Sequence, residues 1–78
     1  TIEYLGRASE GRAQGIGAMI FRPVSGEQPV YYEGSFDAGV PHGVVRVEQA
    51  GRKARVRNFE QGVDRGSADD DQLQRLIF

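Results

Sequence analysis

Residues 32–45 combine aromatic side chains and glycines at fixed offsets, and this pattern constrains the fold more than any other feature of the chain. Because side chains alternate along a strand, Tyr32, Gly34 and Phe36 share one face, and the run Asp37–His42 then breaks the chain before a second strand. The stretch therefore predicts a β-hairpin, with Phe36 opposite Gly43, Gly34 opposite Val45 and Tyr32 opposite Val47.

The glycines of this pattern predict close contacts with the backbone. Glycine is unfavourable in an ordinary strand, so its use at Gly6, Gly17 and Gly34 indicates that something bulky approaches there. The simplest bulky group is an aromatic ring from the next hairpin. We therefore expect these glycines to act as sockets for rings.

The same offsets recur on both sides of this hairpin. Residues 4–17 repeat them 28 residues earlier, with Ala8 in place of the second aromatic residue and an elongated loop at 22–29. They recur again 23 residues later, but Arg55 and Arg57 stand where the pattern has an aromatic residue and a glycine. The chain is thus predicted to be a single domain of three hairpin repeats, the third degenerate, at about 4–21, 32–49 and 55–66.

Alternation and turn residues predict the individual elements. Strands are expected at about 2–8, 15–21, 30–36, 43–49 and 53–59, with Tyr4, Tyr32, Phe36 and Phe59 along one face. Ser67 followed by acidic residues has the form of a helix N-terminus, and Leu73, Leu76 and Ile77 fall at helical spacing. The expected fold is all-β, an antiparallel β-hairpin meander with a short C-terminal capping helix at about 68–78.

The spacing resembles the MORN repeat, whose pattern is Tyr-x-Gly-x-(Trp/Phe)-x-x-Gly-x-x-(His)-Gly-x-Gly. Residues 32–45 match it at every position except the last, where Val45 replaces glycine. The resemblance implies a repeat array used as a scaffold for partner docking, dimerisation or contact with membrane lipids, often beside a separate catalytic domain. A small SH3-like or other closed barrel would also have short strands and glycine-rich turns, but it gives no reason for a 23-residue offset.

Composition excludes several chemistries. The chain has no cysteine and one histidine, so thiolate zinc sites are excluded and a histidine-based metal site is not expected. His42 lies in a turn, where a structural hydrogen bond is favoured over acid–base chemistry. The acidic run Asp69–Asp71 fits a helix N-terminus without a cation. No catalytic constellation and no cofactor site are predicted, so the chain is expected not to be an enzyme.

A basic set in the third repeat is the candidate binding feature. Lys53, Arg55 and Arg57 lie on one face of the expected strand together with Phe59. They form either a solvated or internally paired end strand or a patch for an acidic protein segment or an anionic headgroup. Nucleic acid is not expected because the net charge is −1. The candidate partner-binding residues are Lys53, Arg55, Arg57, Phe59, Tyr32 and Phe36.

The sequence thus predicts a non-enzymatic protein-interaction or scaffold module, with a protein partner and self-association as a further use. An arginine-rich composition and a chain that starts at Thr1 favour a segment of a larger bacterial protein. Two alternatives stay open: a module for anionic lipid headgroups at a membrane surface, and a regulatory appendage of an enzyme.

Overall fold

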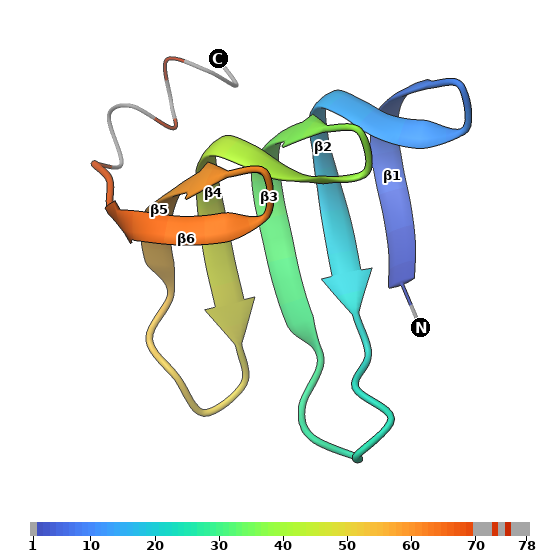
Figure 1. The fold of residues 1–78 in the computed structure, drawn as a ribbon. Coiled ribbons are helices and arrows are strands. Elements are labelled where there is room, and N and C mark those ends of the chain that lie inside the picture. The colour runs from blue at the N-terminus through green and yellow to red at the C-terminus, as the bar shows by residue number, and fades with distance from the viewer. Residues whose placement is uncertain (1, 70–72, 74, 76–78) are drawn as a thin grey trace.

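The computed structural model of the 78-residue chain describes residues 2–69, 73 and 75. These residues form one open antiparallel sheet of six strands, arranged side by side in chain order (Figure 1). The strands are β1 (Ile2–Ser9), β2 (Arg12–Phe21), β3 (Val30–Asp37), β4 (Val40–Gln49), β5 (Arg55–Glu60) and β6 (Val63–Ser67). The predicted all-β meander is confirmed, and a closed barrel is excluded because β1 and β6 lie at opposite edges.

Three hairpins with the same kind of turn make up the described sheet. Their two-residue turns are Glu10–Gly11, Ala38–Gly39 and Gln61–Gly62, and both residues of each turn have positive φ. This is the backbone of a type I′ turn, whose twist matches that of the flanking strands. The turns are spaced 28 and then 23 residues apart, as the sequence offsets predict.

The register of the central hairpin agrees in part with the prediction. Two expected pairs are confirmed, Tyr32 with Val47 and Gly34 with Val45. Phe36 lies opposite Pro41 rather than Gly43, because the register shifts between Gly34 and Phe36. Extra residues of β4 are accommodated in this bulge, where Gly43 has a φ of 100°. The prediction for Phe36 and Gly43 was wrong because it assumed an unbroken ladder.

The third hairpin differs from the prediction in two places. Its second strand, β6, was not predicted. Val63–Ser67 carries few apolar residues and is mostly exposed, so apolar and polar side chains do not alternate there in the way that indicates a strand. Lys53 precedes β5, which begins at Arg55, and therefore lies in a loop rather than in the strand.

The expected helix at 68–78 falls largely on residues outside the described part of the chain. The described elements include no helix. The Ala68 N–H donates to the Val56 carbonyl at 2.9 Å, and the Leu73 N–H donates to the Asp69 carbonyl at 3.3 Å. Leu73 is buried.

One face of the sheet, here called the inner face, carries a row of residues that runs across five strands: Tyr4, Met19, Tyr32, Val47 and Arg55. Each hairpin is bent, so that its turn end lies across the sheet (Figure 1). The bend lets a ring near one turn pack on the tyrosine of the preceding hairpin. Phe36 packs edge-on against Tyr4 at 5.3 Å, and Phe59 against Tyr32 at 6.3 Å, measured between ring centroids.

The glycine sockets are of two kinds. A Cβ on Gly17 would overlap the Tyr4 ring, so this glycine does receive a ring, although from its own hairpin rather than the next. A Cβ on Gly34 would instead overlap the Val44 carbonyl oxygen, and its φ of 152° is one that other residues rarely adopt. The ring expected over Gly34 is therefore absent, and the backbone of β4 occupies that space.

Candidate functional site

A groove runs along the inner face and consists of two adjoining hollows. One hollow, of about 310 Å³, is lined by Val30, Val47 and Gln49 together with the basic residues of the third hairpin. The other, of about 260 Å³, is lined by apolar residues that include Ile2 and Phe21. The rings of Tyr32 and Phe59 line both hollows, so we treat them as one feature, the inner groove.

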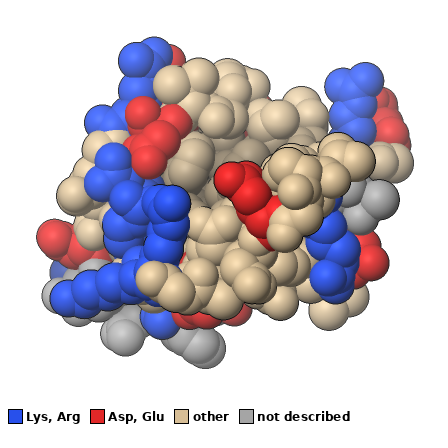
Figure 2. Space-filling view, turned by 90° about the horizontal axis from the view of Figure 1, so that it is seen from below, with Lys and Arg blue, Asp and Glu red and all other residues tan. Residues whose placement is uncertain are grey.

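The basic end of the inner groove carries three cations without an ion pair in the described part of the chain. Arg52 and Lys53 lie in the loop before β5, and Arg55 is the first residue of β5. All three are exposed. Seen from below, lysine and arginine side chains gather along one side of the molecule, beside a hollow lined mainly by uncharged residues (Figure 2). Asp64 also lines this hollow, and the charge of Arg55 contributes to the lowering of its pKa, so one carboxylate offsets part of the positive charge. None of the three cations has to leave a salt bridge within the described residues to bind an anion.

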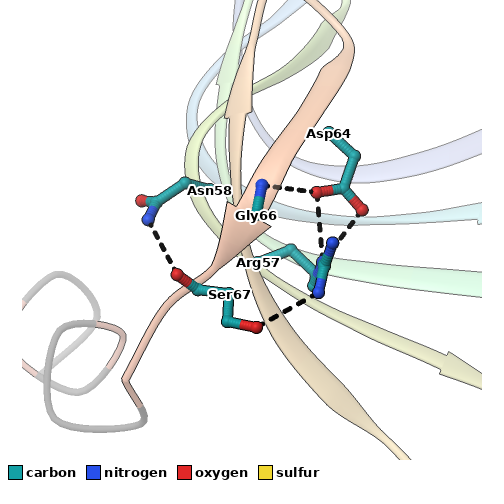
Figure 3. A network of polar contacts seen from close by, with 5 residues as sticks. All are labelled: Arg57, Asn58, Asp64, Gly66 and Ser67. Atoms are coloured by element: carbon teal, nitrogen blue, oxygen red, sulfur yellow. Dashed lines mark hydrogen bonds and ion pairs between the residues drawn. The ribbon is translucent and has the colours of Figure 1, made fainter.

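Arg57 has a different role from Arg55. Its Nε donates to both carboxylate oxygens of Asp64, at 2.9 and 3.0 Å, and its Nη1 donates to the Ser67 hydroxyl at 3.2 Å (Figure 3). The Asp64 carboxylate also accepts the Gly66 N–H at 2.9 Å. The hydrogen bond from Arg57 is the main reason that the pKa of Asp64 is lowered. Arg57 thus clamps β6 to β5 and forms a wall of the groove.

The structure brings most of the predicted site residues together. Lys53, Arg55, Arg57, Phe59 and Tyr32 all line the first hollow. Phe36 does not, because it is only 2% exposed and packs with Tyr4, Ala13 and Met19 in the core.

Sequence reasoning missed other residues of the groove. Arg52 is not among the predicted site residues, although it stands next to Lys53 and adds to the basic end. Ile2 and Phe21 lie opposite each other on β1 and β2, two residues from Tyr4 and Met19 respectively. Alternation from Tyr4 and Met19 would have placed both on the inner face.

The turns are joined by a ladder of polar contacts, and Gly39, Pro41 and Gly62 of this ladder also line the apolar hollow. The Gly39 N–H donates to the Ala13 carbonyl at 3.0 Å, and the Gly62 N–H donates to the Pro41 carbonyl at 2.8 Å. The Ala38 N–H donates to Gln14 Oε1 at 3.1 Å. Each contact in this ladder joins one turn to the hairpin before it.

His42 has the same position in the second hairpin that Gln14 has in the first. Its Nδ1 accepts the Gln61 N–H at 3.0 Å, so the structural hydrogen bond predicted for this residue is confirmed. Asp37 accepts hydrogen bonds from Gln14 Nε2 at 2.9 Å and Gln61 Nε2 at 3.1 Å, and these bonds, the one from Gln14 first, lower its pKa.

The described residues offer no metal centre, since they hold no group of three or more His, Cys, Asp or Glu side chains placed to bind an ion. Of the acidic run 69–71, only Asp69 lies within the described residues. No helix in the described part of the chain has the length and apolar character needed to cross a membrane.

Comparison with protein-family models, with curated proteins and with solved structures finds no match to this chain. The fold and the groove define the class of protein: an open, repeat-built antiparallel sheet with an amphipathic groove on its inner face.

Proposed function

We propose that this chain is a non-enzymatic protein-interaction module of MORN-like repeats, and that its inner groove binds an extended segment of a partner protein. The observation that carries the proposal is that half-buried rings lie directly beside cations that have no ion pair within the described residues. Tyr32 and Phe59 stand between the apolar hollow and the basic end formed by Arg52, Lys53 and Arg55.

The repeat geometry supports the MORN-like part of the proposal. Turn conformations, ring pairs and turn-to-turn hydrogen bonds all recur at the 28- and 23-residue offsets. The third repeat agrees least with the MORN pattern, because Arg55 and Arg57 replace an aromatic residue and a glycine there. Those two replacements supply one open cation and one structural clamp.

The chemistry of the groove favours a segment that combines an apolar side chain with an acidic one. Aromatic residues and arginine are enriched in the hot spots of protein interfaces, where a ring provides contact area and arginine binds carboxylates. The exposed apolar residues Ile2 and Phe21 extend the apolar end, with 62% and 38% of their surfaces accessible. An extended peptide can place side chains in both hollows, which adjoin at Tyr32 and Phe59.

A displayed library of random peptides tests this proposal. We expect selection on the chain to enrich peptides with an aliphatic or aromatic residue near Asp or Glu, and Arg55→Glu to weaken their binding at least about tenfold. The matched control is Arg65→Glu, because Arg65 is exposed, pairs with Glu60 at 3.5 Å and does not line either hollow of the groove. Equal binding by the two variants would contradict the proposed site.

Anionic lipid headgroups are the second candidate, because Arg52 and Lys53 lie on an exposed loop. Three open cations give only about 3 kcal/mol of attraction to an anionic surface, and salt screens it. Co-sedimentation with phosphatidylserine vesicles at low and high salt distinguishes the two functions. Vesicle binding without any peptide enrichment would favour the lipid.

A further inference from the structure

The face of the sheet opposite the inner groove, here called the outer face, carries its own row of side chains. Because side chains alternate along each strand, the direct neighbours of the inner-face row point to this side. They are paired across four strands in the order Leu5, Ala18, Glu33 and Arg46, and Tyr31 lies on the same side in the next row. Leu5 and Tyr31 have 82% and 45% of their surfaces accessible, so large apolar side chains of this face are open to a partner.

Two hollows on the outer face adjoin each other. One, of about 250 Å³, includes Tyr31 and Glu33 in its lining. The other, of about 290 Å³, lies around Leu5. Because Ala18 and Ile20 line both hollows, we treat them as one feature, the outer groove.

The charge of the outer groove is opposite in sign to that of the basic end of the inner groove. It is lined by three carboxylates, those of Glu3, Glu33 and Glu48, and by one cation, Arg46. The Arg46 Nε donates to Glu48 Oε1 at 2.7 Å, and Glu3 lies 3.8 Å from Arg22. Glu33 is exposed and lies opposite Arg46 on the ladder, yet it has no ion pair within the described residues. Its carboxylate can therefore receive a cation from outside.

We infer that the outer groove binds a basic segment of a protein partner, with an arginine of that segment on Glu33 and a neighbouring apolar side chain on Leu5. A guanidinium group binds a carboxylate through two parallel hydrogen bonds, and its flat surface stacks on aromatic rings. Tyr31 is two residues from Glu33 on the same face, a separation of about 7 Å, so one guanidinium can contact both side chains.

The rest of the outer groove fits the remainder of such a segment. Ala18 and Ile20 lie beside Tyr31 and Glu33 and offer an apolar surface for the methylene groups of the arginine. Leu5 is two strands from Glu33 along the ladder, about 10 Å away. A long arginine side chain, together with an apolar residue two positions away in the segment, spans this distance. The inner and outer grooves lie on opposite faces, so both can be occupied at once.

Calorimetric titration of the intact chain with the acetylated and amidated peptide Ser-Leu-Ser-Arg-Ser-Leu-Ser tests the charged contact. A second peptide has citrulline in place of the arginine, which keeps the shape and removes the charge, and it should bind at least about tenfold more weakly. Glu33→Gln should weaken binding of the arginine peptide at least about fivefold. The matched control is Glu27→Gln, because Glu27 is exposed and lines neither hollow of the outer groove. No binding of the arginine peptide up to about 1 mM, or equal losses in the two variants, overturns the inference.

The apolar contact and the choice of face are tested with the same peptide. Leu5→Ser should weaken binding at least about twofold, whereas Val24→Ser should not, because Val24 is fully exposed and outside both hollows. Phe59→Leu alters the inner groove and should bind the arginine peptide with wild-type affinity. If Phe59→Leu loses this affinity while Glu33→Gln retains it, the peptide binds the inner groove and the inference is wrong. Circular dichroism checks that each variant is folded.

Discussion

Gly34 and Gly51 both have positive φ, but only Gly34 is also in close contact with a neighbouring strand. A Cβ on Gly34 would overlap backbone atoms of Val44, which cannot move without breaking the β3–β4 ladder, whereas a Cβ on Gly51 would meet nothing within 4 Å. We expect Gly34→Ala to lower the free energy of unfolding by about 2 kcal/mol more than Gly51→Ala. Chemical denaturation measures both. Equal losses would show that only the backbone conformation matters at Gly34.

Asp37 makes stability depend on pH. Its pKa is lowered in the folded state, mainly by the hydrogen bond from Gln14, so the stabilisation that it provides is present above its unfolded pKa of about 4 and is lost as pH falls through the folded pKa. Melting temperatures of the wild type and Asp37→Asn should therefore differ at neutral pH and converge in strong acid. A constant difference across this range would mean that the charge has no part in the turn ladder.

At the scale of the elements, the clamp between β5 and β6 predicts local behaviour. Asp64→Ala removes the partner of Arg57 and should lower the local stability of β6 by about 1 kcal/mol, because the pair is partly exposed, with 25% and 39% of the two side chains accessible. Hydrogen exchange should then speed up in residues 63–67 and not in β1 or β2. Glu60→Gln is the control, because the Glu60–Arg65 pair is 3.5 Å long and well exposed. Slow exchange in β6 after Asp64→Ala would argue against the clamp.

The elements also show where sequence reasoning succeeds and where it fails. Alternation placed Tyr4, Tyr32, Phe36 and Phe59 on one face correctly, because side-chain direction in a strand depends on local geometry alone. The bulge that moves Phe36 opposite Pro41 could not be predicted from the same pattern. The bulge depends on the φ angles of glycines. Because glycine adopts positive and negative φ about equally readily, its place in the sequence does not reveal which φ it has in the structure.

The candidate site was predictable to the extent that it lies on one strand. Arg55 and Phe59 reach the groove because they alternate along β5. Arg57 follows the same alternation, but its pairing with Asp64 depends on β6, and residues 63–67 carry too few apolar side chains to reveal that strand. Burial of Phe36 depends on the bend of a neighbouring hairpin over Tyr4, which is a tertiary property.

For the whole molecule, the ring pairs couple neighbouring hairpins, in addition to the pairing of adjacent strands and the turn ladder. Phe36 joins the first hairpin to the second and is almost fully buried, whereas Phe59 joins the second to the third and is half-buried beside the groove. Phe36→Ala should cost about 3–5 kcal/mol, as much as the stability expected of so small a domain. The chain should therefore unfold as a unit when this one ring is lost.

Milder substitutions at the same two positions separate folding from binding. Phe36→Leu keeps an apolar group in the core, so this variant should be destabilised yet bind a peptide selected on the wild type with unchanged affinity once folded. Phe59→Leu removes a ring that lines both hollows of the inner groove, and we expect its affinity for the same peptide to fall at least about fivefold. Calorimetric titration at a temperature where circular dichroism shows both variants folded makes the comparison. If folded Phe36→Leu loses affinity while Phe59→Leu retains it, the partner must contact the core ring, and the groove is not the binding site.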